Sequence, residues 1–281
     1  MAAFSWDKIK IKTDNGEEKE GIEPIIISAS RSTDIPAWYA EWFINRLNKG
    51  YVKWINPFNQ QPQYVSFDKT RVVVFWSKNP KPLIPYLDEL DKRGINYYFQ
   101  FTVNDYEDDG LEPRVPPLKE RITNFRELSK KIGKEKVIWR FDPLILTDRI
   151  TVEKLLEKIN RVGSEIPNCT EKLVISFADI GIYTKVQRNL EKTGIRYREF
   201  DAGSMKKIAE GIQEMNKEWG LKISTCAEKV DLVKYSIEPN RCIDDGLMRR
   251  LFSEDKELMK FLGDEQYTLD GKKSNVLKDK G

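Results

Sequence analysis

The 281-residue sequence contains no histidine, and this absence excludes several kinds of active site. Without imidazole the chain cannot form a Ser-His-Asp or Cys-His arrangement, in which histidine activates the nucleophile. Zinc sites that use histidine are excluded for the same reason, and so is the commonest general base at neutral pH. Any chemistry must therefore use carboxylates, lysine, arginine, tyrosine, cysteine, backbone groups or a bound molecule.

Cysteine is scarce, since the chain has only Cys169, Cys226 and Cys242. Three scattered cysteines are too few for an all-cysteine structural zinc site or a four-thiolate iron–sulfur cluster. We therefore predict no metal ligand among them and expect reduced thiols. Cys226 ends the last predicted strand, where it would contact a ligand, although buried thiols are usually just small apolar residues.

Long apolar runs and blocks of like charge are also missing. The longest apolar run, Val72–Trp76, is far shorter than the roughly 20 residues that span a bilayer. Residues 1–12 lack the apolar stretch of a secretory signal, so the expected location is the cytoplasm, with no membrane partner. The net charge is only +3, with acids and bases interleaved. This pattern does not predict an extended nucleic-acid surface, although a local basic patch formed by the fold stays open.

Six short runs rich in β-branched and aromatic residues alternate with segments of helical periodicity. The predicted strands are Pro24–Ser30, Arg71–Ser77, Asn96–Val103, Lys136–Phe141, Lys172–Phe177 and Lys222–Cys226. Apolar residues recur every three or four positions over 118–132, 152–162 and 205–219, which predicts helices between the strands. Such alternation favours a parallel sheet with helices outside it.

The choice between an open sheet and a barrel depends on polar residues within the strands. Gln100, Thr102 and Asn104 share one face of their strand, and Arg140 shares a face with Asp142. An open sheet covered on both sides would have two apolar faces, whereas a barrel mouth that holds a ligand is partly polar. We therefore predict an α/β fold of the TIM-like (β/α) barrel type, as a partial barrel of six units.

The domain organisation follows from the same pattern. Residues 24–252 form the predicted barrel domain, with an inserted β-hairpin near 51–69, where Asn-Pro and Gln-Pro indicate turns. Residues 1–23 form an N-terminal extension with a strand pair around Asn15-Gly16. Residues 253–281 form a C-terminal helix and a polar tail.

Polar residues follow all six predicted strands, and barrel enzymes assemble their active sites from such strand ends. One polar ending is typical of helix capping, but the whole set indicates a binding site. The predicted ligand-binding residues are Ser30, Arg31, Asn79, Gln100, Thr102, Asn104, Arg140, Ser176, Asp179 and Cys226. The predicted catalytic residues are Asp142, Glu228 and Lys78.

The residue types suggest particular roles for these side chains. Arg31 or Arg140 would hold a carboxylate or phosphate with its planar guanidinium, unless Arg140 pairs with Asp142 as part of the packing. Asp142 and Glu228 would accept hydroxyl protons or move protons. Lys78 or Lys229 would form a Schiff base if the amine were desolvated at the strand ends. The alternative is that each is an ordinary solvated lysine in a loop.

Seven segments together carry a resemblance to a known family. They are IISASRSTDIPAWYAEWF (26–43), NPFN (56–59), VFWSKNP (74–80), FQFTVNDY (99–106), VIWRFDPL (137–144), STCAEK (224–229) and RCIDD (241–245). Residues 24–250 resemble the bacterial domain-of-unknown-function family number eighteen forty-eight. The resemblance implies a C-terminal cysteine cluster similar to the CxxxCxxC motif of radical-SAM enzymes, and hence a [4Fe–4S] cluster, S-adenosylmethionine and a six-unit barrel. This chain has no CxxxCxxC and ends at LKDKG (277–281), about where that tail is expected to begin, so no cluster ligand is assigned.

Three hypotheses for function follow. The first is a radical-SAM-like enzyme that binds a small anionic ligand or S-adenosylmethionine at the strand ends. The second is a lyase or aldolase that uses Lys78 or Lys229 as a Schiff-base amine. The third is a non-catalytic module that binds a small molecule or nucleic acid. The substrate and the oligomeric state are not predicted.

Overall fold

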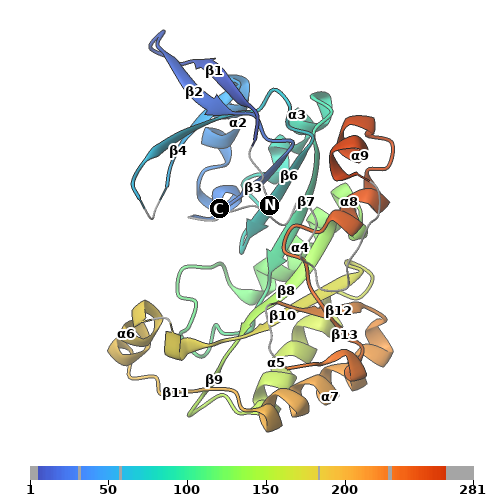
Figure 1. Ribbon diagram of the computed structural model, residues 1–281. Helices are drawn as coiled ribbons and strands as arrows, with labels where there is room; N and C mark the ends of the chain where they lie inside the picture. Colours follow the sequence, from blue (N-terminus) through green and yellow to red (C-terminus); the bar gives the residue numbers. More distant parts are fainter. Residues whose placement is uncertain (1–5, 31–32, 57–58, 183, 227–229, 264–281) are drawn as a thin grey trace. The chain divides into compact units, whose positions relative to one another are not determined.

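The computed structural model describes residues 6–30, 33–56, 59–182, 184–226 and 230–263 as a mixed α/β structure (Figure 1). Its largest sheet has seven strands in the order β13-β12-β10-β8-β7-β6-β3. These strands are β3 (Ile26–Ala29), β6 (Val72–Ser77), β7 (Asn96–Thr102), β8 (Val137–Leu144), β10 (Lys172–Phe177), β12 (Lys222–Thr225) and β13 (Ile237–Pro239). None of the helices in these ranges is long and apolar enough to cross a membrane.

The predicted TIM-like barrel of six units is wrong. The sheet has seven strands and stays open, because no pairing among the described residues joins its edge strands β3 and β13. A closed barrel requires its first and last strands to pair, with a tilt and stagger that suit the number of strands. Alternating strands and helices predict parallel strands, and all six predicted strands are present, but residue types do not specify that closure.

The chain divides into two compact units, whose internal structures are described separately below. Unit 1 comprises the described residues of 1–99 and 243–281, and unit 2 comprises those of 100–242. The boundary falls inside β7, between Phe99 and Gln100.

Unit 1 contains a small sheet that includes both hairpins predicted from the sequence. Its strands are β1 (Lys8–Lys12), β2 (Glu18–Ile22), β5 (Pro62–Ser66) and β4 (Tyr51–Ile55), in that order. β1 and β2 are antiparallel, and Gly16 in their turn has φ +84°, a conformation that glycine adopts without strain. β4 and β5 are also antiparallel, with Tyr51 opposite Ser66, so the predicted hairpin near 51–69 is present.

The rest of unit 1 packs around β3 and β6. Residues 72–75 of β6 are fully buried, as expected for a strand covered on both faces. Asp255 caps the last helix by accepting the N–H of Leu258 at 3.0 Å, and it also accepts from Arg71 Nε and Asn96 Nδ2 at 2.9 and 2.8 Å. The helices of unit 1 are α1 (Ile35–Trp38), α2 (Ala40–Asn48), η1 (Ile84–Tyr86), α3 (Leu87–Lys92), α8 (Asp245–Leu251) and α9 (Lys256–Leu262).

Unit 2 contains the parallel pairs β8–β10, β10–β12 and β12–β13. The short strands β9 (Leu146–Thr147) and β11 (Tyr197–Arg198) pair with each other. The helices of unit 2 are α4 (Leu118–Ile132), η2 (Lys134–Lys136), α5 (Val152–Glu165), η3 (Ile180–Ile182), α6 (Thr184–Lys192), α7 (Ala202–Trp219) and η4 (Val233–Tyr235). Two glycines allow α5 and α7 to approach closely. A Cβ on Gly163 would lie 2.4 Å from the Trp219 ring, and one on Gly211 would lie 2.5 Å from Leu156.

Candidate functional site

A network of polar side chains lies at the carboxyl ends of β8, β10 and β12 in unit 2. Arg140 and Asp142 both belong to β8, and their spacing of two residues places them on the same face of the strand. Because β10 and β12 run parallel to β8, their carboxyl ends bring Ser176 and Cys226 to the same edge of the sheet. This edge is where ligands commonly bind in open α/β sheets.

Arg140 is buried, with 3% of its surface exposed, and its guanidinium has protein partners on all three nitrogens. Nε donates to Asp142 Oδ2 at 2.9 Å, and Nη2 contacts the same oxygen. Nη1 donates to Gln100 Oε1 at 3.3 Å. Burial opposes the charged form, but Asp142 and Cys226 together raise the pKa of Arg140, so it stays a cation. The sequence left open whether Arg140 pairs with Asp142, and the structure shows this pair.

Asp142 is held on both its backbone and its side chain. Asn104 is fully buried and forms two bonds to the Asp142 backbone, accepting from its N–H at 2.9 Å and donating to its carbonyl at 3.1 Å. Ser176 Oγ donates to Asp142 Oδ1. The Asp142 carboxylate thus contacts Arg140 through one oxygen and Ser176 through the other.

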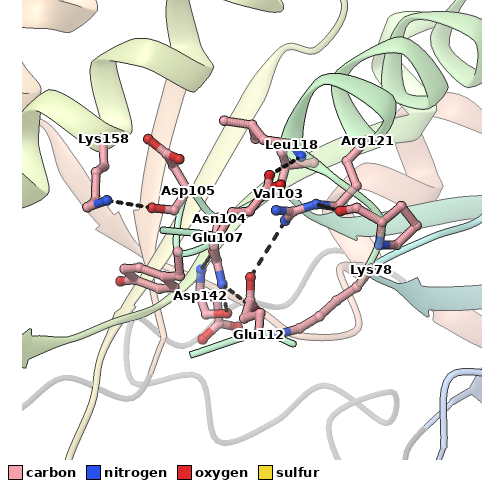
Figure 2. Close-up of polar contacts among 12 residues, drawn as sticks. Lys78, Val103, Asn104, Asp105, Glu107, Glu112, Leu118, Arg121, Asp142 and Lys158 are labelled. Atoms are coloured by element: carbon pink, nitrogen blue, oxygen red, sulfur yellow. Dashed lines mark hydrogen bonds and ion pairs between the residues drawn. The ribbon is translucent and has the colours of Figure 1, made fainter. Parts of the chain in front are cut away.

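A buried carboxylate extends this network toward α4 (Figure 2). Asn104 Nδ2 also donates to Glu112 Oε1 at 3.1 Å, and Glu112 Oε2 lies 3.6 Å from Nη1 of the fully buried Arg121. Burial lowers the pKa of Arg121, and the acidic residues around it, Glu112 first, act in the opposite direction. Figure 2 shows Asn104 between Glu112 and Asp142, so one amide side chain connects the two carboxylate residues.

Cys226 receives hydrogen bonds from several directions. Asn240 Nδ2 lies 3.2 Å from its sulfur and Arg140 Nη2 lies 3.6 Å from it, and the Cys242 thiol also donates to it. The Cys242 hydrogen bond, the charge and hydrogen bond of Arg140 and the Asn240 hydrogen bond outweigh burial and lower the pKa of Cys226 to about 6. The same hydrogen bond raises the pKa of Cys242. At neutral pH the pair therefore consists of a thiolate beside a thiol.

Besides Glu112 and Arg121, this site has two members that the sequence did not predict, Asn240 and Cys242. They follow β13, whose parallel pairing with β12 brings the next residues back to the end of β12. The Asn240 N–H donates to the Thr225 carbonyl at 2.8 Å, and Gln100 Nε2 donates to the Cys242 carbonyl at 3.3 Å. β13 is only three residues long and includes Pro239, so no β-rich run indicated it.

The other predicted site residues lie outside this network. Thr102 and Asp179 belong to unit 2, and within the described ranges neither is hydrogen-bonded to the network; Asp179 is exposed. Ser30 belongs to unit 1, where its Oγ accepts the Ile35 N–H at 3.2 Å.

Lys78 and Asn79 also belong to unit 1. The Lys78 N–H donates to Asp34 at 2.7 Å, and the Asn79 N–H donates to Ser77 Oγ at 2.9 Å. Burial raises the pKa of Asp34, and the Lys78 N–H is the largest opposing influence. Arg31, Glu228 and Lys229 are outside the described residues.

Comparison with known proteins identifies a family but not an activity. No protein of curated function matches the sequence. A crystal structure described as a "putative alpha-L-fucosidase" from Bacteroides thetaiotaomicron VPI-5482 is 12% identical over 82% of each chain, with a TM-score of 0.29, which is too low to support any argument. The family described as "Domain of unknown function (DUF1848)" matches residues 26–274, which confirms the resemblance found in the sequence. The chain belongs to this family.

Proposed function

We propose that unit 2 carries out thiol–disulfide exchange on a small molecule, with Cys226 as the attacking thiolate and Cys242 as the resolving thiol. The observation that supports this proposal is the hydrogen bond between the two cysteines, which leaves Cys226 with a lowered pKa and Cys242 with a raised one. A thiolate next to a second thiol is the arrangement that two-electron thiol chemistry uses. Cys242 is exposed and Cys226 is half-buried, so a substrate can approach the pair from solvent.

The proposed reaction has two steps and balances without any other reactant. Cys226 attacks one sulfur of the substrate disulfide, which gives a mixed disulfide and releases the first substrate thiolate. Cys242 then loses its proton to that thiolate and attacks the Cys226 sulfur, which releases the second. The substrate gains two electrons, and the cysteine pair loses two electrons as its disulfide forms.

The surrounding residues support the first step. Arg140 is a fixed positive charge 3.6 Å from the attacking sulfur, and Asn240 supplies a neutral hydrogen bond at 3.2 Å. Both stabilise the thiolate, so the attacking species is populated at neutral pH. Asp142 holds the guanidinium through Nε and Nη2, so it acts as a positioning residue.

Trapping the mixed disulfide tests the proposal. The reduced, full-length protein is treated at pH 7 with bis(2-hydroxyethyl) disulfide, and its intact mass and disulfide map are recorded over time. We expect the wild type to lose two hydrogen atoms and to form a Cys226–Cys242 disulfide. Cys242→Ser should stop at a mercaptoethanol adduct on Cys226, because no resolving thiol remains. Cys226→Ser should form neither product quickly.

Cys169→Ser is the matched control, because Cys169 is half-buried and burial raises its pKa. This variant should behave like the wild type. The proposal is wrong if Cys226→Ser is modified at the wild-type rate, or if the folded wild type forms no Cys226–Cys242 disulfide.

The iron–sulfur cluster implied by the family resemblance does not fit the residues described. A radical-SAM cluster needs three cysteine ligands, and nowhere in the described ranges do three cysteine, histidine or acidic side chains come together as metal ligands. We therefore derive no step through a cluster. Binding of S-adenosylmethionine stays a prediction from the resemblance, and Schiff-base chemistry at Lys78 or Lys229 stays a prediction from the sequence.

A further inference from the structure

A cleft of about 330 Å³ lies within unit 1, and all of its lining residues belong to that unit. It is formed by the β1–β2 turn, helix α2 and strands β4 and β5. Its lining residues are Thr13, Asp14, Asn15, Trp42, Arg46, Tyr51, Lys53 and Tyr64. The volume is at the lower end of the roughly 300–1,000 Å³ found for small-molecule sites, so it suits one small ligand.

Three aromatic side chains line the cleft. The rings of Tyr51 and Tyr64 lie 6.2 Å apart between centroids, inclined at 35°. Trp42 on α2 is 44% exposed, although an indole is one of the largest apolar surfaces that a side chain can bury. A planar ring placed in the cleft would cover part of this exposed surface by stacking.

The charges in the cleft favour an anion. Arg46 donates from Nη1 to Asp14 at 2.9 Å and from Nε to the Tyr51 carbonyl at 3.0 Å, and its guanidinium lies 4.6 Å from the Tyr51 ring centroid. Asp14 therefore balances Arg46, whose pKa it raises. Lys53 is exposed and has no acidic partner in the described part of the chain, so the net charge of the lining is positive.

We infer that this cleft binds a nucleoside monophosphate, as a free molecule or as one unit of a single strand. The base would stack on Trp42 and Tyr64, and the phosphate would lie by Lys53, within the field of Arg46. Aromatic rings that accept any base, combined with a cation for the backbone phosphate, are the usual means of binding single nucleotides without sequence preference. The inference rests on unit 1 alone and does not depend on the proposed thiol chemistry.

Isothermal titration calorimetry of the full chain with adenosine 5′-monophosphate tests this inference. Trp42→Ala should weaken binding about five-fold or more, because stacking of the base is lost. Lys53→Gln should weaken it about ten-fold, because a charged hydrogen bond to the phosphate is lost. Adenosine without phosphate should bind the wild type about as weakly as the monophosphate binds Lys53→Gln.

Two matched controls lie outside the cleft. Trp38→Ala removes a tryptophan that is 67% exposed, and Lys10→Gln removes an exposed lysine of β1 that pairs with Glu18 at 3.3 Å. Neither should change the affinity. An oligoadenylate octamer distinguishes the two sources of the ligand: tighter, salt-dependent binding indicates a single strand, and binding of the monophosphate alone indicates a free nucleotide. The inference is overturned if the wild type binds neither probe, or if Trp42→Ala binds as the wild type does.

Discussion

Nη2 of Arg140 lies 3.6 Å from the Cys226 sulfur and also contacts the Asp142 carboxylate. One buried guanidinium thus contacts two anionic groups, a carboxylate on its own strand and the thiolate of Cys226, which directly follows β12. Because the carboxylate fixes its orientation, the cation cannot turn away from the sulfur. The state of Cys226 therefore depends on residues of β8 as well as on those around the sulfur itself.

Arg140→Gln should make Cys226 less acidic and the protein less stable. The variant removes the cation beside the thiolate and leaves Asp142 without its cationic partner, although Ser176 still donates to it. We expect the pKa of Cys226 to rise toward its ordinary value. The free energy of unfolding should fall by about 2–4 kcal/mol. This is somewhat less than the cost of breaking a fully buried ion pair, because the Asp142 side chain is 24% exposed and water can solvate it. Urea unfolding and pH-dependent alkylation measure the two effects. A stable variant with unchanged Cys226 reactivity would contradict this account.

The stability of the protein should depend on pH through Cys226. Its pKa is lowered in the folded state, so the thiolate stabilises the fold fully above the ordinary thiol pKa of 9, and this contribution is lost as the pH falls through about 6. Between these values, the free energy of unfolding of the wild type should rise relative to Cys226→Ser. The rise is at most about 1.4 kcal/mol for each pH unit. The pKa of Cys242 is raised in the folded state, so its contribution to stability is lost only as the pH rises above the ordinary thiol value of 9. Parallel curves for the two proteins between pH 6 and 9 would refute the lowered pKa.

Asn104→Ala should destabilise unit 2 far more than Asp179→Asn. Asn104 satisfies both backbone groups of Asp142, and their loss costs about 1–3 kcal/mol for each buried group left without a partner. Asp179 is exposed, so its substitution should leave the free energy of unfolding unchanged within about 0.5 kcal/mol. Chemical denaturation of both variants provides the comparison. Equal effects would show that Asn104 does not hold Asp142 in solution.

Gly163→Ala tests the packing of α5 on α7. The added methyl group would lie 2.4 Å from the Trp219 ring, so the helices must separate or the indole must turn. Overpacking of this kind costs about 1–3 kcal/mol. Gly203→Ala, in the first turn of α7, is the control, because its Cβ would meet nothing nearer than 3.4 Å. A thermal unfolding midpoint that falls only for Gly163→Ala supports the close contact, and unchanged midpoints for both would contradict it.

Six of the seven strands of the large sheet, and the long helices, are predictable from local residue patterns. The apolar spacing of residues 118–132 predicts α4 with the bounds observed, and the alternation of strands with helices predicts parallel pairing. Closure of the sheet is not predictable in this way. It depends on whether two strands far apart in sequence pair with each other, and residue types do not specify that pairing.

The site was predictable where it depends on the period of a single strand. Arg140 and Asp142 share a face because they are two residues apart, and both were predicted. Asn240 and Cys242 reach Cys226 only through the pairing of β13 with β12, which three residues with a proline do not reveal. Arg140 was predicted to hold a ligand, and this stays a prediction; in the structure its guanidinium contacts Asp142, Gln100 and Cys226.

The rate of Cys226 alkylation as a function of pH tests the central claim most directly. The reduced protein is treated with iodoacetamide from pH 5 to pH 10, and modification at Cys226 is quantified by peptide mass spectrometry, with Cys169 as the internal reference. The account predicts a midpoint near pH 6 for Cys226 and a midpoint above the ordinary thiol value for Cys169. A Cys226 midpoint near 9 would show that Arg140, Asn240 and Cys242 do not stabilise a thiolate, and the proposed chemistry would lose its attacking group.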